Sequence, residues 1–297
     1  MSALSSLGRW LKDPPPAYAF ELSEAGVAAA QTGRAPRIWF TPLERDVISI
    51  SPVRDNVLRP EALATQVRAL VPADGRRKRR AALILPDYAA RVTVLDFDDF
   101  PSDLKEQASL IRFRMKRSVP FDVDSAALSF YGQRDGRNGK RVEAVVCIAP
   151  LEVVAPYESP FRQAGFQVGW VTVSALAALE LVSVEGLKVL VKRTGRFLTI
   201  SVQSAGVLKL MRSIELTDST REEIAGHLHP TVAYIEDQLS ARPDALLLCG
   251  FETGAESLRA WLETELGVRV GLLASPYGQP AEYNAGLLGF LESIKER

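Results

Sequence analysis

The chain alternates between short apolar runs and longer stretches in which apolar residues recur three or four positions apart. The short runs predict strands, and the longer stretches predict amphipathic helices. Each half of the chain passes through strands, a helix, a strand and a helix, which predicts an α/β chain of two similar lobes. The expected strands lie at 18–22, 27–31, 38–41, 47–52, 81–85, 92–96, 126–131, 142–149, 168–171, 187–192, 197–203, 207–214, 245–249 and 268–273. The expected helices lie at 59–71, 102–118, 151–164, 175–184, 219–241 (broken or kinked at Pro230), 255–266 and 284–293.

Two of these elements are distinctive. The strand at 245–249 is apolar throughout, which is typical of a central parallel strand buried on both faces. The helix at 102–118 begins with Ser102 as its expected N-cap and carries acidic residues in its first turn, where the helix dipole favours negative charge. One apolar stripe is enough to pack a helix on a sheet, so a second apolar side must be covered by this chain or by another. The first stripe holds Leu104, Ala108, Ile111 and Met115, and the second side holds Leu110 and Phe113.

Composition narrows the class of protein. A length of 297 residues favours two lobes over one core. A formal net charge of zero argues against a general nucleic-acid binder, because such a protein needs a basic excess to neutralise phosphates. The basic run at 76–80 is expected to be a solvated loop beside a strand, with an anionic-lipid patch as the alternative. The first residues place Leu4, Leu7, Trp10 and Leu11 on one side of a short helix, for contact with a membrane, a partner or the chain's own domain.

No set of residues with catalytic spacing stands out. The two histidines, His227 and His229, are two positions apart on an expected helix, so they point in different directions and cannot share a metal. Cys147 and Cys249 each lie in an apolar run, which predicts core residues in a reducing compartment. The sequence holds no nucleophile elbow, P-loop or dinucleotide-binding fingerprint. We therefore expect a protein that is not an enzyme.

One stretch of the chain resembles a known family. From Leu83 to Ala178 the sequence has a strand ending in Leu85-Pro86, an acidic Phe97–Pro101 corner, a charged helix with a Val119-Pro120-Phe121 exit, and the strand VEAVVCIAP. This order and spacing resemble the PilM family of type IV pilus assembly proteins, which are relatives of FtsA. The resemblance implies an α/β, actin-like (ribonuclease H-like) bilobed fold with a small inserted FtsA-type subdomain. The implied division is 1–80 for the first part of lobe 1, 81–155 for the inserted 1C-type subdomain, 156–186 for the remainder of lobe 1, and 187–297 for lobe 2.

The resemblance also points to three turns that are glycine-rich in family members that bind ATP. Glycine is needed there because backbone N–H groups approach a phosphate closely. The first matching turn, Glu21-Leu22-Ser23, lacks the glycine. The second is Lys192-Arg193-Thr194 with Gly195 one place late, and its lysine repels a cation. The third is Gly250-Phe251, whose ring is expected in the path of the adenosine. We therefore expect no cofactor and no ATP turnover; the alternative is an actin-like ATPase with an unusual site.

The resemblance implies a partner as well. It implies a non-catalytic cytoplasmic scaffold, peripheral to the inner membrane, that captures the cytoplasmic N-terminal peptide of a PilN-like bitopic membrane protein between lobe 1 and the inserted subdomain. Other pilus platform proteins and the assembly ATPases are further implied partners, and nucleic acid is not. A GspL-like module of a type II secretion platform is the alternative. The candidate partner-binding residues are Leu110, Phe113, Arg114, Arg117, Val119, Pro120 and Phe121; in the alternative reading they pack on lobe 1 of the same chain.

Overall fold

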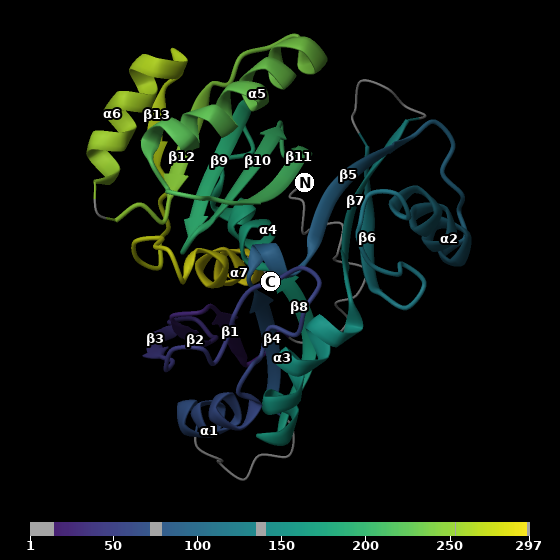
Figure 1. Cartoon of the computed structure of the whole chain (residues 1–297), viewed down its shortest axis with the longest axis vertical. Helices are drawn as coiled ribbons and strands as arrows, with labels where there is room; N and C mark the ends of the chain where they lie inside the picture. The colour runs from purple at the N-terminus through teal and green to yellow at the C-terminus, as the bar shows by residue number, and fades with distance from the viewer. Residues whose placement is uncertain (1–14, 72–78, 135–140, 253, 296–297) are drawn as a thin grey trace.

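The chain forms two lobes and a smaller insert in the computed structural model, which describes residues 15–71, 79–134, 141–252 and 254–295 (Figure 1). The expected N-terminal helix and most of the basic run lie outside the described residues. The last two residues of that run, Arg79 and Arg80, begin a strand. Arg79 is buried, contrary to the expected solvated loop, because its guanidinium donates to the Val71 carbonyl oxygen at 2.9 Å and lies over the Phe166 ring.

The first lobe is built on a five-stranded mixed sheet in the order β3-β2-β1-β4-β8. Strands β1, β2 and β3 are antiparallel neighbours, and β4 runs parallel to both β1 and β8. One face is covered by helices α1 and α3, around a core of packed rings that includes Phe20, Phe161 and Phe166. The elements are β1 (Tyr18–Leu22), β2 (Gly26–Gln31), β3 (Arg37–Pro42), α1 (Pro60–Leu70), β4 (Arg79–Leu85), α3 (Leu151–Gln163) and β8 (Phe166–Val173).

The second lobe repeats this plan with a sheet in the order β11-β10-β9-β12-β13. Strand β12 lies parallel between β9 and β13 and is almost fully buried, which confirms the central parallel strand expected at 245–249. Helix α5 continues through Pro230 without a break. The elements are β9 (Leu187–Thr194), β10 (Phe197–Ser204), β11 (Val207–Glu215), α5 (Arg221–Leu239), β12 (Ala245–Cys249), α6 (Ala255–Leu266) and β13 (Val270–Leu272).

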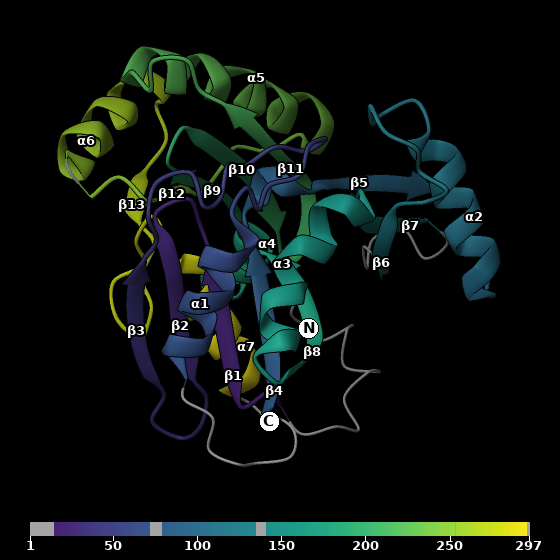
Figure 2. The ribbon, with the colours of Figure 1, turned by 60° about the horizontal axis from the view of Figure 1, so that its bottom comes forward.

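The insert is a three-stranded antiparallel sheet, in the order β5-β7-β6, with one helix. Helix α2 packs Ile111 and Met115 on one face of this sheet. The other face packs on Leu208 and Met211 of β11, so the insert sheet lies between α2 and the second lobe (Figures 1 and 2). The elements are β5 (Arg91–Phe97), α2 (Leu104–Met115), β6 (Ala127–Arg134) and β7 (Val142–Ala149).

Two elements lie in a different part of the molecule from the one expected. Strand β4, assigned to the insert from the sequence, is a central strand of the first sheet. Helix α7 (Ala285–Lys295), assigned to lobe 2, packs on the second face of the first sheet, where Leu287 and Phe290 contact Ala28 and Ile84. Hydrophobic spacing predicts the type of an element but not the sheet on which it packs.

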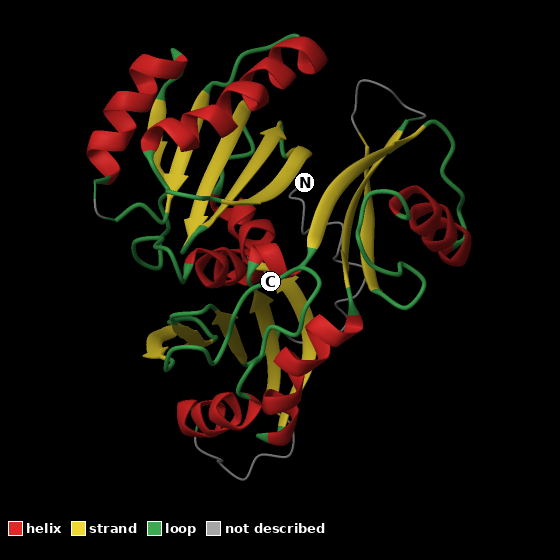
Figure 3. Ribbon diagram, viewed as in Figure 1, coloured by secondary structure: helices red, strands yellow, loops and turns green. Residues whose placement is uncertain are grey.

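Helices α4 (Ser174–Ala178) and α7 cross where the two lobes join (Figure 3). Their backbones approach closely at Gly286 and Gly289, where any added Cβ would lie less than 3 Å from backbone atoms of α4. None of the helices among the described residues has the length and apolarity needed to cross a bilayer.

The N-cap of α2 is also displaced by one residue from its expected place. Asp103, and not Ser102, accepts hydrogen bonds from the backbone N–H groups of Lys105 at 2.9 Å and Glu106 at 3.1 Å. Both residue types are good N-caps, so composition alone does not separate two adjacent candidates.

Candidate functional site

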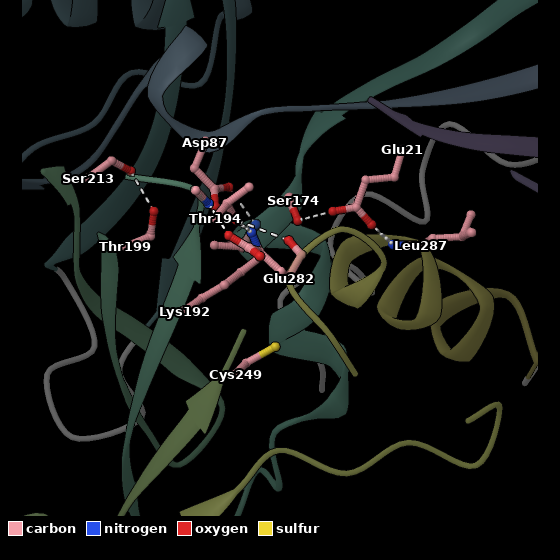
Figure 4. A network of polar contacts seen from close by, with 12 residues as sticks. Glu21, Asp87, Ser174, Lys192, Thr194, Thr199, Ser213, Cys249, Glu282 and Leu287 are labelled. Atoms are coloured by element: carbon pink, nitrogen blue, oxygen red, sulfur yellow. Dashed lines mark hydrogen bonds and ion pairs between the residues drawn. The ribbon is translucent and has the colours of Figure 1, made fainter. Parts of the chain in front are cut away.

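Glu21 of the first expected nucleotide turn and Lys192 and Thr194 of the second lie in a buried polar cluster between the lobes (Figure 4). Ser23 of the first turn instead bonds Gly26 within its own hairpin turn. Lys192, near the end of β9, extends its ammonium group to the first lobe, where Nζ lies 3.0 Å from Oδ2 of Asp87. The lysine side chain is 0% exposed and the aspartate side chain 3% exposed. This ion pair joins the two lobes across their junction.

Asp87 is the residue of this cluster that the sequence did not reveal. It opens the short 3-10 helix η2 (Asp87–Ala89) directly after β4, and its Oδ1 accepts a hydrogen bond from the backbone N–H of Ala175 at 2.5 Å. The Pro86-Asp87 turn was the available signal, but an acidic residue after a strand is usually solvated. One carboxylate thus binds both the second lobe and helix α4.

The second turn is closed by the chain itself. The Lys192 ammonium also donates to Oγ1 of Thr194 at 2.6 Å, and that hydroxyl donates to the Glu282 carbonyl oxygen at 3.3 Å. The backbone N–H of Gly195 donates to the Glu282 carboxylate. A side-chain carboxylate therefore occupies a backbone N–H group that the resemblance assigned to a phosphate.

Glu21, at the end of β1, ties the first sheet to both crossing helices. One of its oxygens accepts from the Ser174 hydroxyl of α4, and the other accepts from the backbone N–H of Leu287 in α7 at 2.7 Å. Burial raises the pKa of Glu21 above its ordinary value, although Lys192 lowers it. Burial by itself lowers the pKa of Lys192, but Asp87 and Glu21 together hold that pKa above its ordinary value.

Glu21 gives a testable dependence of stability on pH. A carboxyl whose pKa is raised on folding binds its proton more tightly in the folded state, so its contribution to stability is lost as the pH rises above 4.5. Replacing Glu21 with glutamine removes this titration beside Lys192 and Asp87. We expect the free energy of unfolding of Glu21→Gln to increase relative to that of the wild type as the pH rises from 4.5 towards 7. Urea unfolding at a series of pH values measures the difference, and a constant difference would contradict the prediction.

Two further contacts cross the junction of the lobes. Tyr88, of η2, stacks on Phe197 of β10 with ring centroids 4.6 Å apart. Arg196 lies 3.7 Å from the Glu24 carboxylate of the first lobe and also pairs with Glu215 at 2.7 Å. Apolar and charged contacts thus accompany the buried ion pair.

Comparison with solved structures identifies the fold of this chain. No family model matches the sequence, and no curated protein matches it. Among solved structures, the PilM–PilN type IV pilus biogenesis complex superposes with a TM-score of 0.78 at 18% identity, over 96% of this chain and 100% of that one. A Bacteroides thetaiotaomicron protein of unknown function with an actin-like ATPase fold gives a TM-score of 0.59 at 14% identity, over 94% and 96% of the two chains. The cytoplasmic domain of EpsL, from the type II secretion system of Vibrio cholerae, gives 0.52 at 12% identity, over 94% and 95%.

The chain has the actin-like fold. This confirms the fold class expected from the sequence, and the structural likeness to PilM extends over both lobes and the insert. The three expected nucleotide turns lie at the ends of β1, β9 and β12.

The third turn of this actin-like chain differs from its expectation. Phe251 is only 5% exposed and packs in the core of the second lobe, so its ring does not stand in the path of an adenosine. Arg193 lies over that ring, 5.3 Å from its centroid, and its Nε donates to the Gly250 carbonyl oxygen at 3.0 Å. Gly250 has a φ of 80°, and a Cβ there would lie 2.1 Å from the Arg193 carbonyl oxygen. The chain's own backbone thus requires this glycine.

The seven candidate partner-binding residues divide into two groups. Leu110, Val119 and Phe121 pack against the core of the insert. Phe113 is 76% exposed, on the side of α2 opposite the buried Ile111 and Met115, so it does not pack on lobe 1. The remaining exposed members are Arg114, Arg117 and Pro120.

Helix α2 runs back towards the first lobe. The strand that follows its exit begins at Ala127, which pairs with Ala149 at the end of β7, immediately before α3. The exit segment 116–126 therefore leads to the lobe 1 end of the insert, where Leu151 is 56% exposed. Leu104, expected in the packed stripe, is 70% exposed because it lies in the first turn at the opposite end of α2.

The acidic corner at the end of β5 makes a surface ion pair. Asp96 pairs with Arg141 at 3.2 Å. Across the described residues, no group of three His, Cys, Asp or Glu side chains is placed to hold a metal ion.

Proposed function

We propose that this chain is a PilM-like, non-catalytic scaffold that lies on the cytoplasmic side of the inner membrane in a type IV pilus assembly platform. Its partner in this proposal is the cytoplasmic N-terminal peptide of a PilN-like bitopic membrane protein. The likeness to the PilM–PilN complex over 96% of the chain supports the platform and the partner. The buried Lys192–Asp87 pair carries the proposal that nucleotide turnover has been lost.

The ion pair argues against ATP on energetic grounds. A magnesium–phosphate group at the second turn would have to displace Lys192 from Asp87, because the ammonium is fully buried between Asp87 and Thr194. Breaking a buried pair by removing one partner costs about 3–5 kcal/mol, which would weaken nucleotide binding by roughly two to three and a half orders of magnitude. An ammonium in place of a carboxylate also repels the magnesium ion.

Isothermal titration calorimetry with Mg-ATP tests the loss of the nucleotide site. We expect no binding with a dissociation constant below about 100 μM. Micromolar binding would contradict the proposal and favour the alternative of an actin-like ATPase with an unusual site. Measuring phosphate release on the same protein separates silent binding from turnover.

The proposed peptide site lies on the insert. It comprises the exposed members of the predicted set, Phe113, Arg114, Arg117 and Pro120, with Leu110, Val119 and Phe121 forming the packed floor behind them. An exposed aromatic side chain beside arginines is the usual composition of an interface anchor. The peptide proposed for this surface therefore combines apolar anchors with acidic groups, and it continues towards Leu151 at the lobe 1 end of the insert.

The structural likeness to the EpsL cytoplasmic domain favours a second candidate, a module of a type II secretion platform. The two candidates differ in the partner. Pull-down with the N-terminal peptide of a PilN-like protein supports the first, whereas capture of other inner-membrane components of a type II secretion system without the peptide supports the second.

A further inference from the structure

The buried polar cluster between the lobes contains its own positive charge, the ammonium group of Lys192. Glu21 and Asp87 belong to the first lobe, while Lys192 and Thr194 belong to the second (Figure 4). Lys192 contributes the positive charge, and both acids raise its pKa. Its ammonium group donates to Asp87 of the first lobe and to Thr194 of its own lobe.

We propose that Lys192 acts as a resident cation that locks the two lobes in one closed arrangement without any bound ligand. The closed arrangement of the two lobes then depends on side chains of this protein and not on a bound ligand. Resting on the proposed function, the same lock makes capture of the partner peptide independent of nucleotide. We call the set Glu21, Asp87, Lys192, Thr194 and Glu282 the inter-lobe lock.

The lock reaches the parts of the fold about which the lobes would turn. Asp87 binds the N–H of Ala175 in α4, and Glu21 binds both Ser174 in α4 and Leu287 in α7. These helices cross where the lobes join, and the two acids that hold them lie beside Lys192. Movement of Lys192 away from the first lobe would take the ion-pair partner from Asp87 and the compensating charge from Glu21. Buried acids without a compensating charge are costly, which favours all-or-none closure.

The insert secures the lobes at a second place. It leaves the first lobe at Arg91 and returns at Ala149, yet its sheet packs on β11 of the second lobe. The Gln133 side-chain amide exchanges hydrogen bonds with the backbone of Leu208, and Lys209 lies 2.9 Å from the Glu143 carboxylate. A hinge opening of the lobes would therefore also have to shear the insert from β11.

Lys192→Ala tests the lock, since it removes the cation and leaves a space the size of n-propylammonium. The distance between the lobes can be measured by pulsed electron spin resonance with labels at Ala69→Cys in α1 and Ser257→Cys in α6, both exposed. Burial raises the pKa of both native thiols, Cys147 and Cys249, to about 12, so they compete poorly for the label.

We expect a single narrow distance in the wild type, unchanged by Mg-ATP. Lys192→Ala should broaden and lengthen it and lower the melting temperature by roughly 8–15 °C. Added n-propylammonium should restore both values, whereas tetramethylammonium at the same ionic strength, which cannot donate a hydrogen bond, should not. Lys192→Met, which fills the space without charge, should behave like the alanine variant without rescue. Lys295→Ala, a surface control whose side chain is 55% exposed, should match the wild type.

Asp87→Asn is the milder variant if Lys192→Ala does not fold, because it keeps the shape and removes the charge. An unchanged narrow distance in Lys192→Ala would overturn the proposal. If Lys192→Ala is unfolded both with and without n-propylammonium, an unchanged narrow distance in Asp87→Asn would overturn it instead. Failure of rescue in a folded Lys192→Ala would overturn the role of the ammonium as a resident cation. If the wild type binds Mg-ATP with its distance unchanged, the proposed loss of the nucleotide site fails but the lock stands. A distance that changes with Mg-ATP overturns both.

Discussion

Gly289→Ala is expected to destabilise the protein strongly, by about 3 kcal/mol or more, although the same change in most helix interiors is stabilising. A Cβ at Gly289 would lie 2.2 Å from the carbonyl oxygen of Ala177 and 2.8 Å from the Cα of Ala178. Both are backbone atoms of the α4 segment and cannot rotate away. Alanine at this place would therefore force the two crossing helices apart and disturb the apolar core on either side of them.

Gly226 provides the matched control. It lies inside α5, and apart from its chain neighbours and the backbone of its own helix no heavy atom lies within 4 Å of the position where its Cβ would be built. Gly226→Ala should therefore raise the free energy of unfolding by up to about 1 kcal/mol, the ordinary difference in helix propensity. Urea unfolding of the two variants should give effects of opposite sign. A Gly289→Ala variant as stable as the wild type would show that the crossing has room to relax.

The sequence predicted the type and position of single helices and strands better than it predicted which of them pack together. The hairpin of β1 and β2, the buried strand β12 and the insert strands β6 and β7 all appear close to their expected positions, because each has a clear apolar pattern bounded by turn residues. The placement of β4 and α7 was wrong, since an apolar strand or helix fits more than one sheet. Actin-like connectivity returns the last helix to the first lobe, which no local pattern encodes.

The junction of the lobes shows a second limit of prediction from the sequence, which concerns contacts between distant residues. Glu21 and Lys192 could be singled out because they replace residues of expected turns, but Asp87 could not. The ion pair that it forms with Lys192 joins positions 105 residues apart in the sequence. Phe251 was expected in the path of the adenosine, but its ring packs in the second lobe's core, where Arg193 covers it. Side-chain direction at a turn depends on packing that a single sequence does not contain.

The contacts that join the lobes are separate from the recognition surface proposed on α2. The lobes are joined by the Lys192–Asp87 pair, by the α4–α7 crossing and by the insert on β11. Helix α2 lies outside all three contacts, with its exposed side turned away from the sheet that it covers (Figure 2). Changes on that side should therefore alter binding without altering the fold.

Phe113→Glu is the sharpest test of this separation. The side chain is 76% exposed, so the change should leave the free energy of unfolding within about 0.5 kcal/mol of the wild type. An aromatic anchor at the centre of an interface contributes about 2–4 kcal/mol, and a carboxylate would also repel an acidic peptide. We expect the affinity for the N-terminal peptide of a PilN-like protein to fall by roughly 30- to 1,000-fold.

Leu104→Glu is the matched control for Phe113→Glu, because it places the same charge on the same helix at a side chain that is 70% exposed. It lies at the far end of α2 from the exit segment and should leave peptide affinity within about twofold. Fluorescence anisotropy with a labelled peptide measures both affinities, and thermal unfolding checks the fold. Equal binding by both variants would place the peptide site elsewhere on the molecule, and unfolding of Phe113→Glu would show that this side chain supports the core of the insert. Loss of binding in Phe113→Glu alone would assign recognition to the outer side of α2, outside the buried cluster between the lobes.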